Sequence, residues 1–304
     1  MVHTTPRTRV RIDRQTLREW LVFWLFLGPN LLLFAVFTYW PLIYNAYLSM
    51  TDWDFIRPEP EWIGPGNYLA VLGSRTFRAV AHNTVVFTGA SVLLTLGLGL
   101  GLALLLNQRL RWRNGARAVL FSPTILSGAA VGIVWMYMFD PRYGLLSQML
   151  GWFGIASPNW LGSPDWAMPA IIIVYVWKNL GYAVVIYLAG LQAIDRSLYE
   201  AALVDGAGAW ARFRNITLPG LSPVTFFLSV TSVLSCFQAF DMIQVMTQGG
   251  PLNATNTLIY HLYELGFISY RAGEAGVVAM IMFVVMLTLT VIQVRIIERR
   301  VHYA

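Results

Sequence analysis

The chain has 304 residues, of which 57% are hydrophobic and 12% are charged, and its formal net charge is +6. A soluble domain carries about 25% charged residues, so this composition excludes an ordinary soluble domain and indicates a membrane protein. A single cysteine, Cys236, excludes a disulfide within the chain, and the four histidines lack the spacing of a metal site. We expect charges between apolar segments to report orientation in a bilayer rather than nucleic-acid binding.

Six segments are apolar over the roughly 20 residues that a helix needs to cross a bilayer. In chain order they are residues 20–40, 80–106, 118–139, 166–194, 222–240 and 275–294. The first is longer than the apolar core of a signal peptide, so we expect a retained anchor helix. In the second, Gly97 and Gly101 have the spacing of a close helix–helix contact in membranes. The only charged residue inside any of the six segments is Lys178.

The arginines lie mainly on one side of the predicted membrane segments. Fifteen fall in the two tails and in the loops that share their side, whereas five fall in the loops of the opposite side. Cytoplasmic loops carry the excess of positive residues, so both termini are expected in the cytoplasm. The stretch between the fourth and fifth segments is then expected to be cytoplasmic as well.

A short amphipathic helix is predicted over residues 197–213, inside that stretch. Ser197 and Glu200 have the spacing of a capping box, which marks a helix start. Apolar residues and one glycine recur at spacings of four and three, as on one face of a helix: Tyr199, Leu203, Gly206, Trp210 and Phe213. Pro219 is expected to end the helical region, with Ser222 as the N-cap of the next span.

The same stretch is rich in small residues, which let another backbone come close. They are Ala201, Ala202, Gly206, Ala207 and Gly208. This composition favours docking into a protein groove over lying on a membrane surface, where helices rich in Lys and Arg are usual. Taken singly, Glu200 also fits a simple cap, Asp205 a solvated charge and Gly206 a relief of crowding.

The lysine content excludes one kind of nucleotide site. Lys178 is the only lysine, and it follows Trp177 rather than a glycine. The phosphate-binding P-loop requires Gly-Lys followed by Ser or Thr. If ATP drives the function, another subunit binds it.

The residues around the predicted helix resemble the EAA loop of ABC importer membrane subunits. The match comprises Glu200-Ala201-Ala202, Asp205-Gly206-Ala207, Phe213, Ile216, Leu218-Pro219 and Pro223, with the spacing of that loop throughout. In that family the loop forms a coupling helix that inserts into a cleft on the ATPase subunit. The resemblance therefore implies ATPase coupling by Glu200, Ala201, Ala202, Asp205, Gly206, Ala207, Leu218 and Pro219.

The resemblance implies an all-α integral membrane protein with six transmembrane helices. Residues 76–297 look like the five-helix, MetI-like permease core, and residues 1–75 supply the N-terminal tail, one extra helix and an outer loop, while residues 298–304 form a cytoplasmic C-terminal tail. The implied partners in the inner membrane are a second permease subunit, an ABC ATPase dimer on the cytoplasmic face and an extracytoplasmic solute-binding protein. ATP and Mg²⁺ are then held by the ATPase, and this chain binds no cofactor or nucleic acid and is not an enzyme.

Three further stretches are similar to the carbohydrate-uptake branch of that family, on the side of the maltose-type first permease subunit. They are Val176-Trp-Lys-Asn-Leu-Gly-Tyr182, Leu188-Ala-Gly-Leu-Gln-Ala-Ile194 leading into the loop, and Phe240-Asp241 followed by Thr247-Gln-Gly-Gly-Pro251. Residues 249–267 and the ending 299–303 look most like the first permeases of sn-glycerol-3-phosphate importers. The resemblance therefore implies import of sn-glycerol-3-phosphate or a glycerophosphodiester, with a di- or oligosaccharide as the alternative.

In maltose-type relatives the substrate is held in mid-membrane by the third, fourth and fifth spans. The corresponding positions are Thr124, Gly128, Trp177, Gly181, Ser232, Ser235, Cys236 and Ala239. Only Gly181 keeps the residue expected for maltose, which indicates a different ligand. Neighbouring polar residues are further candidates: Lys178, Asn179, Tyr182, Gln238 and Asp241.

Two of these candidates have alternative interpretations. A charge inside a membrane span is a functional hypothesis by default, so Lys178 is interpreted either as a substrate contact or as the partner of a carbonyl or acid. Asp241 is interpreted either as a pathway residue or as a span-end residue in water.

Two other classes of membrane protein fit less well. A secondary transporter usually shows internal repeats and ionisable coupling groups inside its spans, where this chain has only Lys178. A membrane enzyme needs a nucleophile or metal constellation such as His-Glu-x-x-His, which the sequence lacks.

Overall fold

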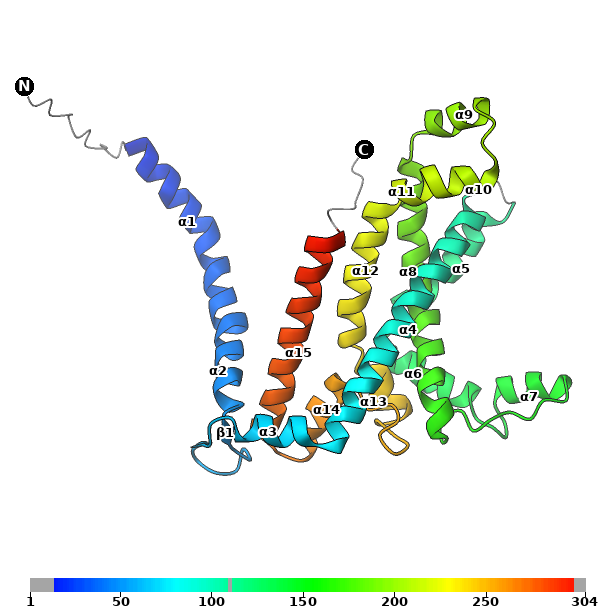
Figure 1. Ribbon diagram of the computed structural model, residues 1–304. Helices are drawn as coiled ribbons and strands as arrows, with labels where there is room; N and C mark the ends of the chain where they lie inside the picture. Colours follow the sequence, from blue (N-terminus) through cyan, green and yellow to red (C-terminus); the bar gives the residue numbers. More distant parts are fainter. Residues whose placement is uncertain (1–13, 109–110, 298–304) are drawn as a thin grey trace, which may run out of the picture.

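The computed structural model describes residues 14–108 and 111–297, and these are mostly helical (Figure 1). The helices, with the π-helical turns η1–η4 that continue some of them, are in chain order α1 Arg14–Phe34, η1 Ala35–Tyr39, α2 Trp40–Leu48, α3 Gly66–Gly73, α4 Arg75–Leu106, α5 Arg113–Ile125, α6 Gly128–Met138, α7 Leu145–Trp152, α8 Pro164–Ala193, α9 Arg196–Val204, α10 Ala209–Arg212, η2 Phe213–Thr217, α11 Leu218–Gly220, α12 Ser222–Phe237, α13 Asp241–Met246, α14 Leu258–Tyr263, η3 Glu264–Ile268, α15 Ala272–Ile292 and η4 Gln293–Ile297. Two short strands, β1 Thr51–Asp52 and β2 Glu61–Trp62, pair antiparallel between α2 and α3.

Five helical stretches in the described part of the chain are long and apolar enough to cross a membrane. They are Arg18–Leu48, Arg75–Leu106, Pro164–Ala193, Ser222–Met246 and Ala272–Arg295. Each overlaps one of the predicted spans, which confirms a multi-span, all-α membrane fold. The remaining predicted span, residues 118–139, is wrong as a single helix, because α5 and α6 meet there at an angle of 105°. The described part of the chain therefore has five continuous spans, or six if the bent pair is counted as one span.

The bend between α5 and α6 has a local cause. Leu126 and Ser127 are extended, with ψ of 147° and 145°, so the helical hydrogen-bond ladder stops there. The Ser127 hydroxyl then accepts a hydrogen bond from the backbone N–H of Ala130 and caps the start of α6. A serine in an apolar segment thus marks a new helix start rather than a position within one span.

The bundle is organised around α4, which packs along α8 and against α12. One buried cluster, which includes Tyr187 and Leu228, lies toward the end from which α9 and α10 project, and we call this the hairpin end. The close approach along α4 is made by Gly99, where an added Cβ would lie 2.9 Å from the Cβ of Ala183. The two glycines predicted for this role, Gly97 and Gly101, have open space beside them within the described chain.

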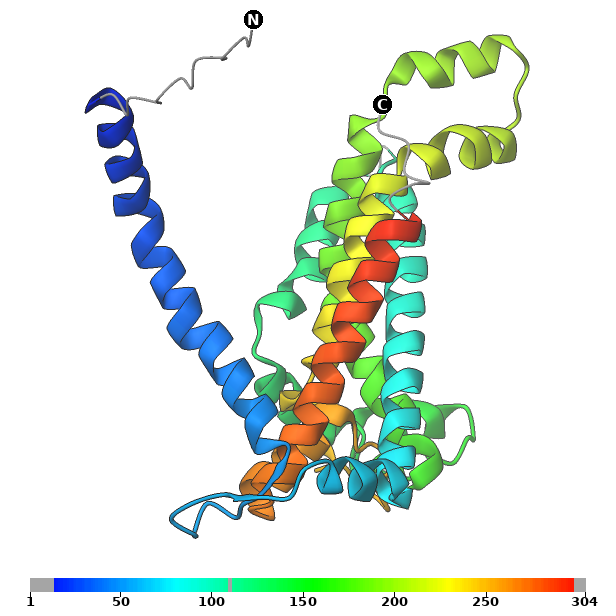
Figure 2. The ribbon, with the colours of Figure 1, turned by 60° about the vertical axis from the view of Figure 1, so that its left-hand side comes forward.

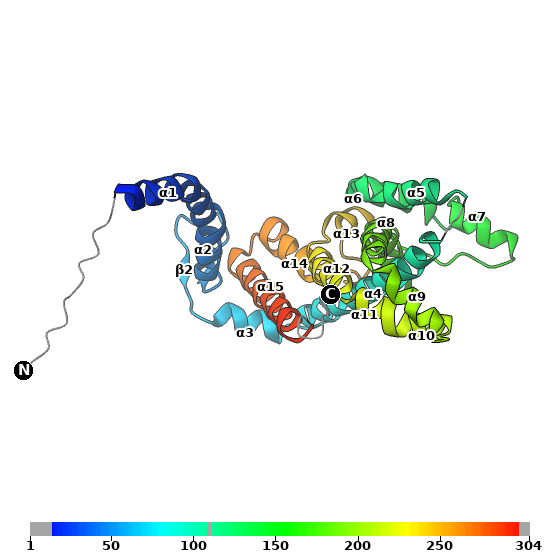
Figure 3. The same ribbon diagram turned by 90° about the horizontal axis from the view of Figure 1, so that it is seen from above.

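The first span stands away from the bundle (Figure 1, Figure 3). The apolar part of Arg18–Leu48 buries none of its residues against the described chain. Contact is made at its far end, where α2 lies against α15 and the Asn45 side chain donates a hydrogen bond to the Gly276 carbonyl at 3.4 Å. Seen from above, α1 and α7 lie at opposite ends of an elongated row.

Candidate functional site

The predicted coupling helix is a hairpin of two arms at the end of the bundle (Figure 2). The first arm is α9, which follows α8, and the second arm comprises α10, η2 and α11 and leads into α12. We call residues 195–220 the hairpin. The prediction of one helix over residues 197–213 is therefore wrong, because the chain reverses direction within it.

The first arm begins at Asp195. Its carboxylate accepts a hydrogen bond from the Ser197 backbone N–H at 2.9 Å, and this bond lowers the pKa of the carboxyl. The predicted capping box is wrong, because α9 starts at Arg196 and Asp195 is its N-cap. Asp is as good an N-cap as Ser, so a cap two residues earlier in the sequence takes the role. Glu200 is left exposed on the surface of α9.

The first arm ends at a glycine in a left-handed conformation. Gly206 has φ of +73°, and the backbone N–H groups of Gly206 and Ala207 donate to the carbonyls of Leu203 and Ala202. This pair of bonds is the Schellman motif, in which glycine is favoured because it has no Cβ. The predicted stripe from Tyr199 to Phe213 is therefore not one helix face.

The second arm continues through Pro219 rather than ending there. Thr217 and Leu218 keep helical backbone angles, and Pro219 lies in the first turn of α11, where its missing N–H costs little. Ser222 is likewise not an N-cap: it is the first residue of α12, and its hydroxyl donates to the Pro219 carbonyl at 2.7 Å. The prediction that proline stops the helical region is wrong for this reason.

The hairpin carries an apolar tip that the described chain leaves uncovered. The exposed fractions are 55% for Leu203, 89% for Val204 and 69% for Trp210. The predicted coupling residues Glu200, Ala201, Asp205 and Gly206 are also exposed, Ala202 and Ala207 are half-buried, and Leu218 and Pro219 lie at the base of the second arm. An exposed apolar tip on a capped hairpin suits docking into a groove of another protein.

The second region of interest is a cavity of about 140 Å³ enclosed by α4, α8 and α12. Its lining is Ser91, Thr95, Tyr175, Asn179, Tyr182, Ala183, Thr231, Ser232, Ser235 and Cys236. Most of these side chains carry a hydroxyl. Four predicted pathway residues lie here together: Asn179, Tyr182, Ser232 and Ser235. Cys236, one of the positions matched to the maltose-type relatives, also lines the cavity.

The sequence interpretation missed the α4 side of the cavity. Ser91 and Thr95 are not among the pathway residues that the sequence predicts, because the nearby Gly97 and Gly101 indicate helix packing in this segment. A usable signal was present, since hydroxyl residues recur along one face of α4 at spacings of four, three and four: Thr84, Thr88, Ser91 and Thr95. All four are buried.

The remaining pathway candidates lie outside the cavity lining. Thr124 donates a hydrogen bond from its hydroxyl to the backbone carbonyl of Lys178 at 3.0 Å, joining α5 to α8. The Lys178 side chain is half-buried and forms no ion pair within residues 14–108 and 111–297. Trp177 packs its ring against Trp135, with centroids 5.4 Å apart. Gln238 is exposed at the end of α12.

Two glycines among the candidates have packing roles. An added Cβ at Gly181 would collide with the backbone around Leu120 and Phe121, so this glycine lets α8 approach α5. An added Cβ at Gly128 would collide with the Asp241 carboxylate, which brings the start of α6 against α13. Asp241 is itself exposed and accepts a hydrogen bond from the Met242 N–H.

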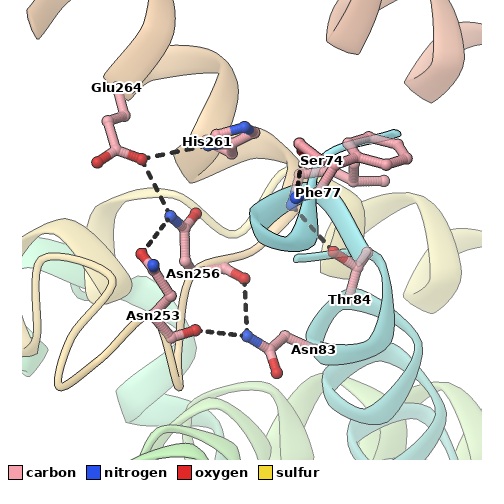
Figure 4. A network of polar contacts seen from close by, with 9 residues as sticks. Ser74, Phe77, Asn83, Thr84, Asn253, Asn256, His261 and Glu264 are labelled. Atoms are coloured by element: carbon pink, nitrogen blue, oxygen red, sulfur yellow. Dashed lines mark hydrogen bonds and ion pairs between the residues drawn. The ribbon is translucent and has the colours of Figure 1, made fainter. Parts of the chain in front are cut away.

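A polar network fixes the loop between α13 and α14 at the end opposite the hairpin (Figure 4). The Asn83 side chain donates to the carbonyls of Asn253 and Asn256 at 2.7 and 3.1 Å. Asn256 in turn donates to Glu264, whose carboxylate also lies 3.2 Å from His261. This network holds the loop against α4 and α14.

The family match and the similar relatives are all membrane components of transport systems. Residues 94–303 match the family described as "Binding-protein-dependent transport system inner membrane component". The sn-glycerol-3-phosphate transport system permease protein UgpA of Agrobacterium fabrum is 34% identical, over 92% of this chain and 96% of the relative. The trehalose/maltose transport system permease protein MalF of Thermococcus litoralis is 38% identical, over 92% of this chain and 94% of the relative.

The fold is also similar to that of a bacterial ABC transporter involved in import of the acidic polysaccharide alginate. The TM-score is 0.81 at 27% identity, over 94% of this chain and 98% of the permease chain. A second structure of the alginate transporter, in complex with an alginate pentasaccharide-bound periplasmic protein, gives the same TM-score at 25% identity.

Proposed function

We propose that this chain, which belongs to the family of binding-protein-dependent transport system inner membrane components, is one of two permease subunits of an importer for sn-glycerol-3-phosphate or a glycerophosphodiester, a substrate suggested by the names of its relatives. It is a multi-pass inner-membrane permease of an ABC importer for sugar-type solutes. It is not an enzyme, because ATPase activity in such importers lies in a partner subunit.

The exposed hairpin carries the proposal for coupling. It joins two adjacent spans, presents Val204 and Trp210 to the outside, and belongs to a chain without a P-loop. We assign the hairpin end to the cytoplasm from the arginine distribution. An ABC ATPase dimer there would hold the hairpin in a groove and bind ATP and Mg²⁺ itself. Closure of that dimer would move α8 and α12. This movement would change the side of the membrane to which the solute pathway is open.

The other partners follow from surfaces that the chain leaves uncovered. The apolar first span stands apart from its own bundle, which supports a second permease subunit beside it in the bilayer. The end opposite the hairpin would receive an extracytoplasmic solute-binding protein, a kind of partner supported by the alginate transporter structure that includes a periplasmic protein.

The substrate assignment rests on relatives named for sn-glycerol-3-phosphate, and the alternative is a di- or oligosaccharide. The sequence identity to the trehalose/maltose relative is slightly higher than to the sn-glycerol-3-phosphate relative, and this supports the di- or oligosaccharide alternative. Within the described residues, the cavity lining contains neutral polar groups and does not include Lys178.

The test is ATP-dependent uptake by the complex purified through a tag on this chain. The complex is reconstituted in liposomes with its solute-binding protein and offered labelled sn-glycerol-3-phosphate, glycerophosphocholine, trehalose or maltose. We expect uptake of one of the first two. Uptake of a disaccharide alone would support the alternative, and a complex without an ATPase chain, indifferent to ATP, would support a secondary transporter.

A further inference from the structure

The hydroxyls of Ser91 and Thr95 lie at the inner end of the cavity between α4, α8 and α12, and we call them the floor hydroxyls. Ser91 is 0% exposed and Thr95 is 3% exposed, and the hydroxyl oxygen of each has no hydrogen-bond partner in the described chain. Both line the cavity. A buried polar atom that makes no hydrogen bond costs free energy, so two of them in one cavity indicate that something polar occupies it.

The opening of the cavity lies on the side of α8 and α12. Tyr182 and Ser235 line it and are exposed, whereas the α4 residues are fully enclosed. The cavity therefore extends inward from Tyr182 and Ser235 toward Ser91 and Thr95. A ligand group that enters would pass two polar side chains before reaching the buried hydroxyls.

The chemistry of the lining selects for an uncharged ligand group. The side chains that line it offer hydroxyls, one amide and one thiol, and none of these residues is Lys, Arg, Asp or Glu. Phosphates are bound by Arg, Lys or clustered backbone N–H groups at helix starts, whereas this cavity faces middle turns of α4 and α8 and the C-terminal turns of α12. Alcohol groups, by contrast, pair well with Ser, Thr, Tyr and Asn, which both donate and accept.

We propose that this cavity binds an uncharged polyhydroxyl group of the imported solute, with Ser91 and Thr95 as its innermost contacts. The inference rests on the proposed import function, because the ligand is taken to be part of the transported molecule. Water occupies about 30 Å³ per molecule in the liquid, so a cavity of about 140 Å³ holds a group of several heavy atoms. A glycerol moiety or part of one sugar ring fits this description, and an oligosaccharide does not.

Cys236 gives a direct measure of occupancy. It lines the cavity and is the only cysteine of the chain. The complete importer complex is treated with methyl methanethiosulfonate, and modification of Cys236 is followed by mass spectrometry of this chain. The probes are glycerol, trehalose, sn-glycerol-3-phosphate and inorganic phosphate. At about ten times its dissociation constant, a bound probe should slow modification about tenfold.

The proposal requires that at least one of glycerol, trehalose and sn-glycerol-3-phosphate slows modification, rather than inorganic phosphate alone. Replacing both floor hydroxyls (Ser91→Ala with Thr95→Val) should remove the protection. Thr88→Val is the matched control, because Thr88 is buried and unpartnered on the same face of α4 but does not line the cavity. If the double variant fails to assemble, Ser91→Ala alone should still reduce the protection severalfold.

Three results would overturn the proposal. They are absence of protection by glycerol, trehalose and sn-glycerol-3-phosphate alike, protection by inorganic phosphate alone, and protection that survives the loss of both floor hydroxyls. The first means that the cavity holds water only. ATP-dependent uptake is measured on the same preparation, so uptake without protection rejects the cavity site alone. Protection without ATP-dependent uptake rejects the proposed function alone.

Discussion

The hydroxyls of Tyr199 and Thr217 lie 2.9 Å apart and join the two arms of the hairpin. Tyr199 is in the middle of α9, and Thr217 is buried where the second arm enters the bundle. The bond therefore fixes the angle of the first arm relative to the spans. The bond thereby stiffens the hairpin where it joins the spans.

Removal of that bond should weaken coupling. A hydrogen bond contributes about 1 kcal/mol net, so we expect Tyr199→Phe to lower the ratio of solute imported to ATP hydrolysed about fivefold. Thr217→Val should have the same effect, and the double variant should be no worse than either single one. Additive losses in the double variant would mean that the two hydroxyls act separately.

The left-handed glycine at the tip should be intolerant of substitution for a backbone reason. Gly206 has φ of +73° and open space around its Cβ position, so Gly206→Ala strains the backbone by about 1–2 kcal/mol without a clash. Gly208→Ala is the matched control, because Gly208 also has open space but an ordinary φ of −69°. We expect reduced coupled uptake for the first variant and normal uptake for the second.

A bulky residue at the same position tests docking itself. Gly206→Trp should leave the spans inserted, as judged by membrane extraction, but should uncouple ATP hydrolysis from uptake. Coupled transport at the normal ratio in this variant would argue against a close contact at Gly206.

The cap of α9 should make the hairpin sensitive to acid. The Ser197 N–H lowers the pKa of Asp195 in the folded state, so its stabilising effect is present above the unfolded value near 4 and is lost as pH falls through the folded pKa. Hydrogen-exchange protection of the first turn of α9 should therefore fall below about pH 4. In Asp195→Asn, which keeps a capping oxygen without a titrating carboxyl, this protection should not change with pH.

Gly181 should be needed for the stability of the fold and not only for the choice of substrate. An added Cβ would meet the α5 backbone, and overpacking of this kind costs about 1–3 kcal/mol. We expect Gly181→Ala to lower the thermal unfolding temperature of the complex. Gly101→Ala, in open space on α4, should leave it unchanged or raise it. Equal melting temperatures for Gly181→Ala and the unmodified complex would contradict the packing role.

The single lysine of the chain tests the remaining pathway hypothesis. Lys178→Ala should lower uptake while the complex still assembles, because the Thr124 bond goes to the Lys178 backbone and survives the substitution. Lys178→Arg should retain part of the activity, since it keeps the charge. Unchanged uptake kinetics in Lys178→Ala would exclude a role for this side chain in transport.

Composition and apolar length predict the spans well, because a helix must satisfy its own backbone hydrogen bonds in lipid. They do not predict where a span bends. Leu126 and Ser127 are ordinary in sequence, yet both are extended where α5 ends and α6, which packs against α13, begins. The sequence predicts a helical element here but not its turn, because Gly206 fits a thinned helix face as well as a left-handed end.

The cavity lies beyond what one-dimensional patterns predict. Ser232 and Ser235 were found through a family resemblance, whereas Ser91 belongs to a different span, more than a hundred residues earlier. The α4 hydroxyls face the cavity lined by Ser232 and Ser235 because of the way α4 is rotated about its own axis. That rotation is set by contacts such as Gly99 against Ala183, which sequence spacing alone does not identify.

The two arms of the hairpin are continuous with different walls of one cavity. α9 follows directly from α8, and the second arm runs through η2 and α11 into α12. If the hairpin docks on an ATPase as we propose, a force on its tip acts on both helices at once, and these helices carry Tyr182 and Ser235 of the cavity lining. ATP hydrolysis would then change the access of solute to the buried hydroxyls by moving α8 and α12 together.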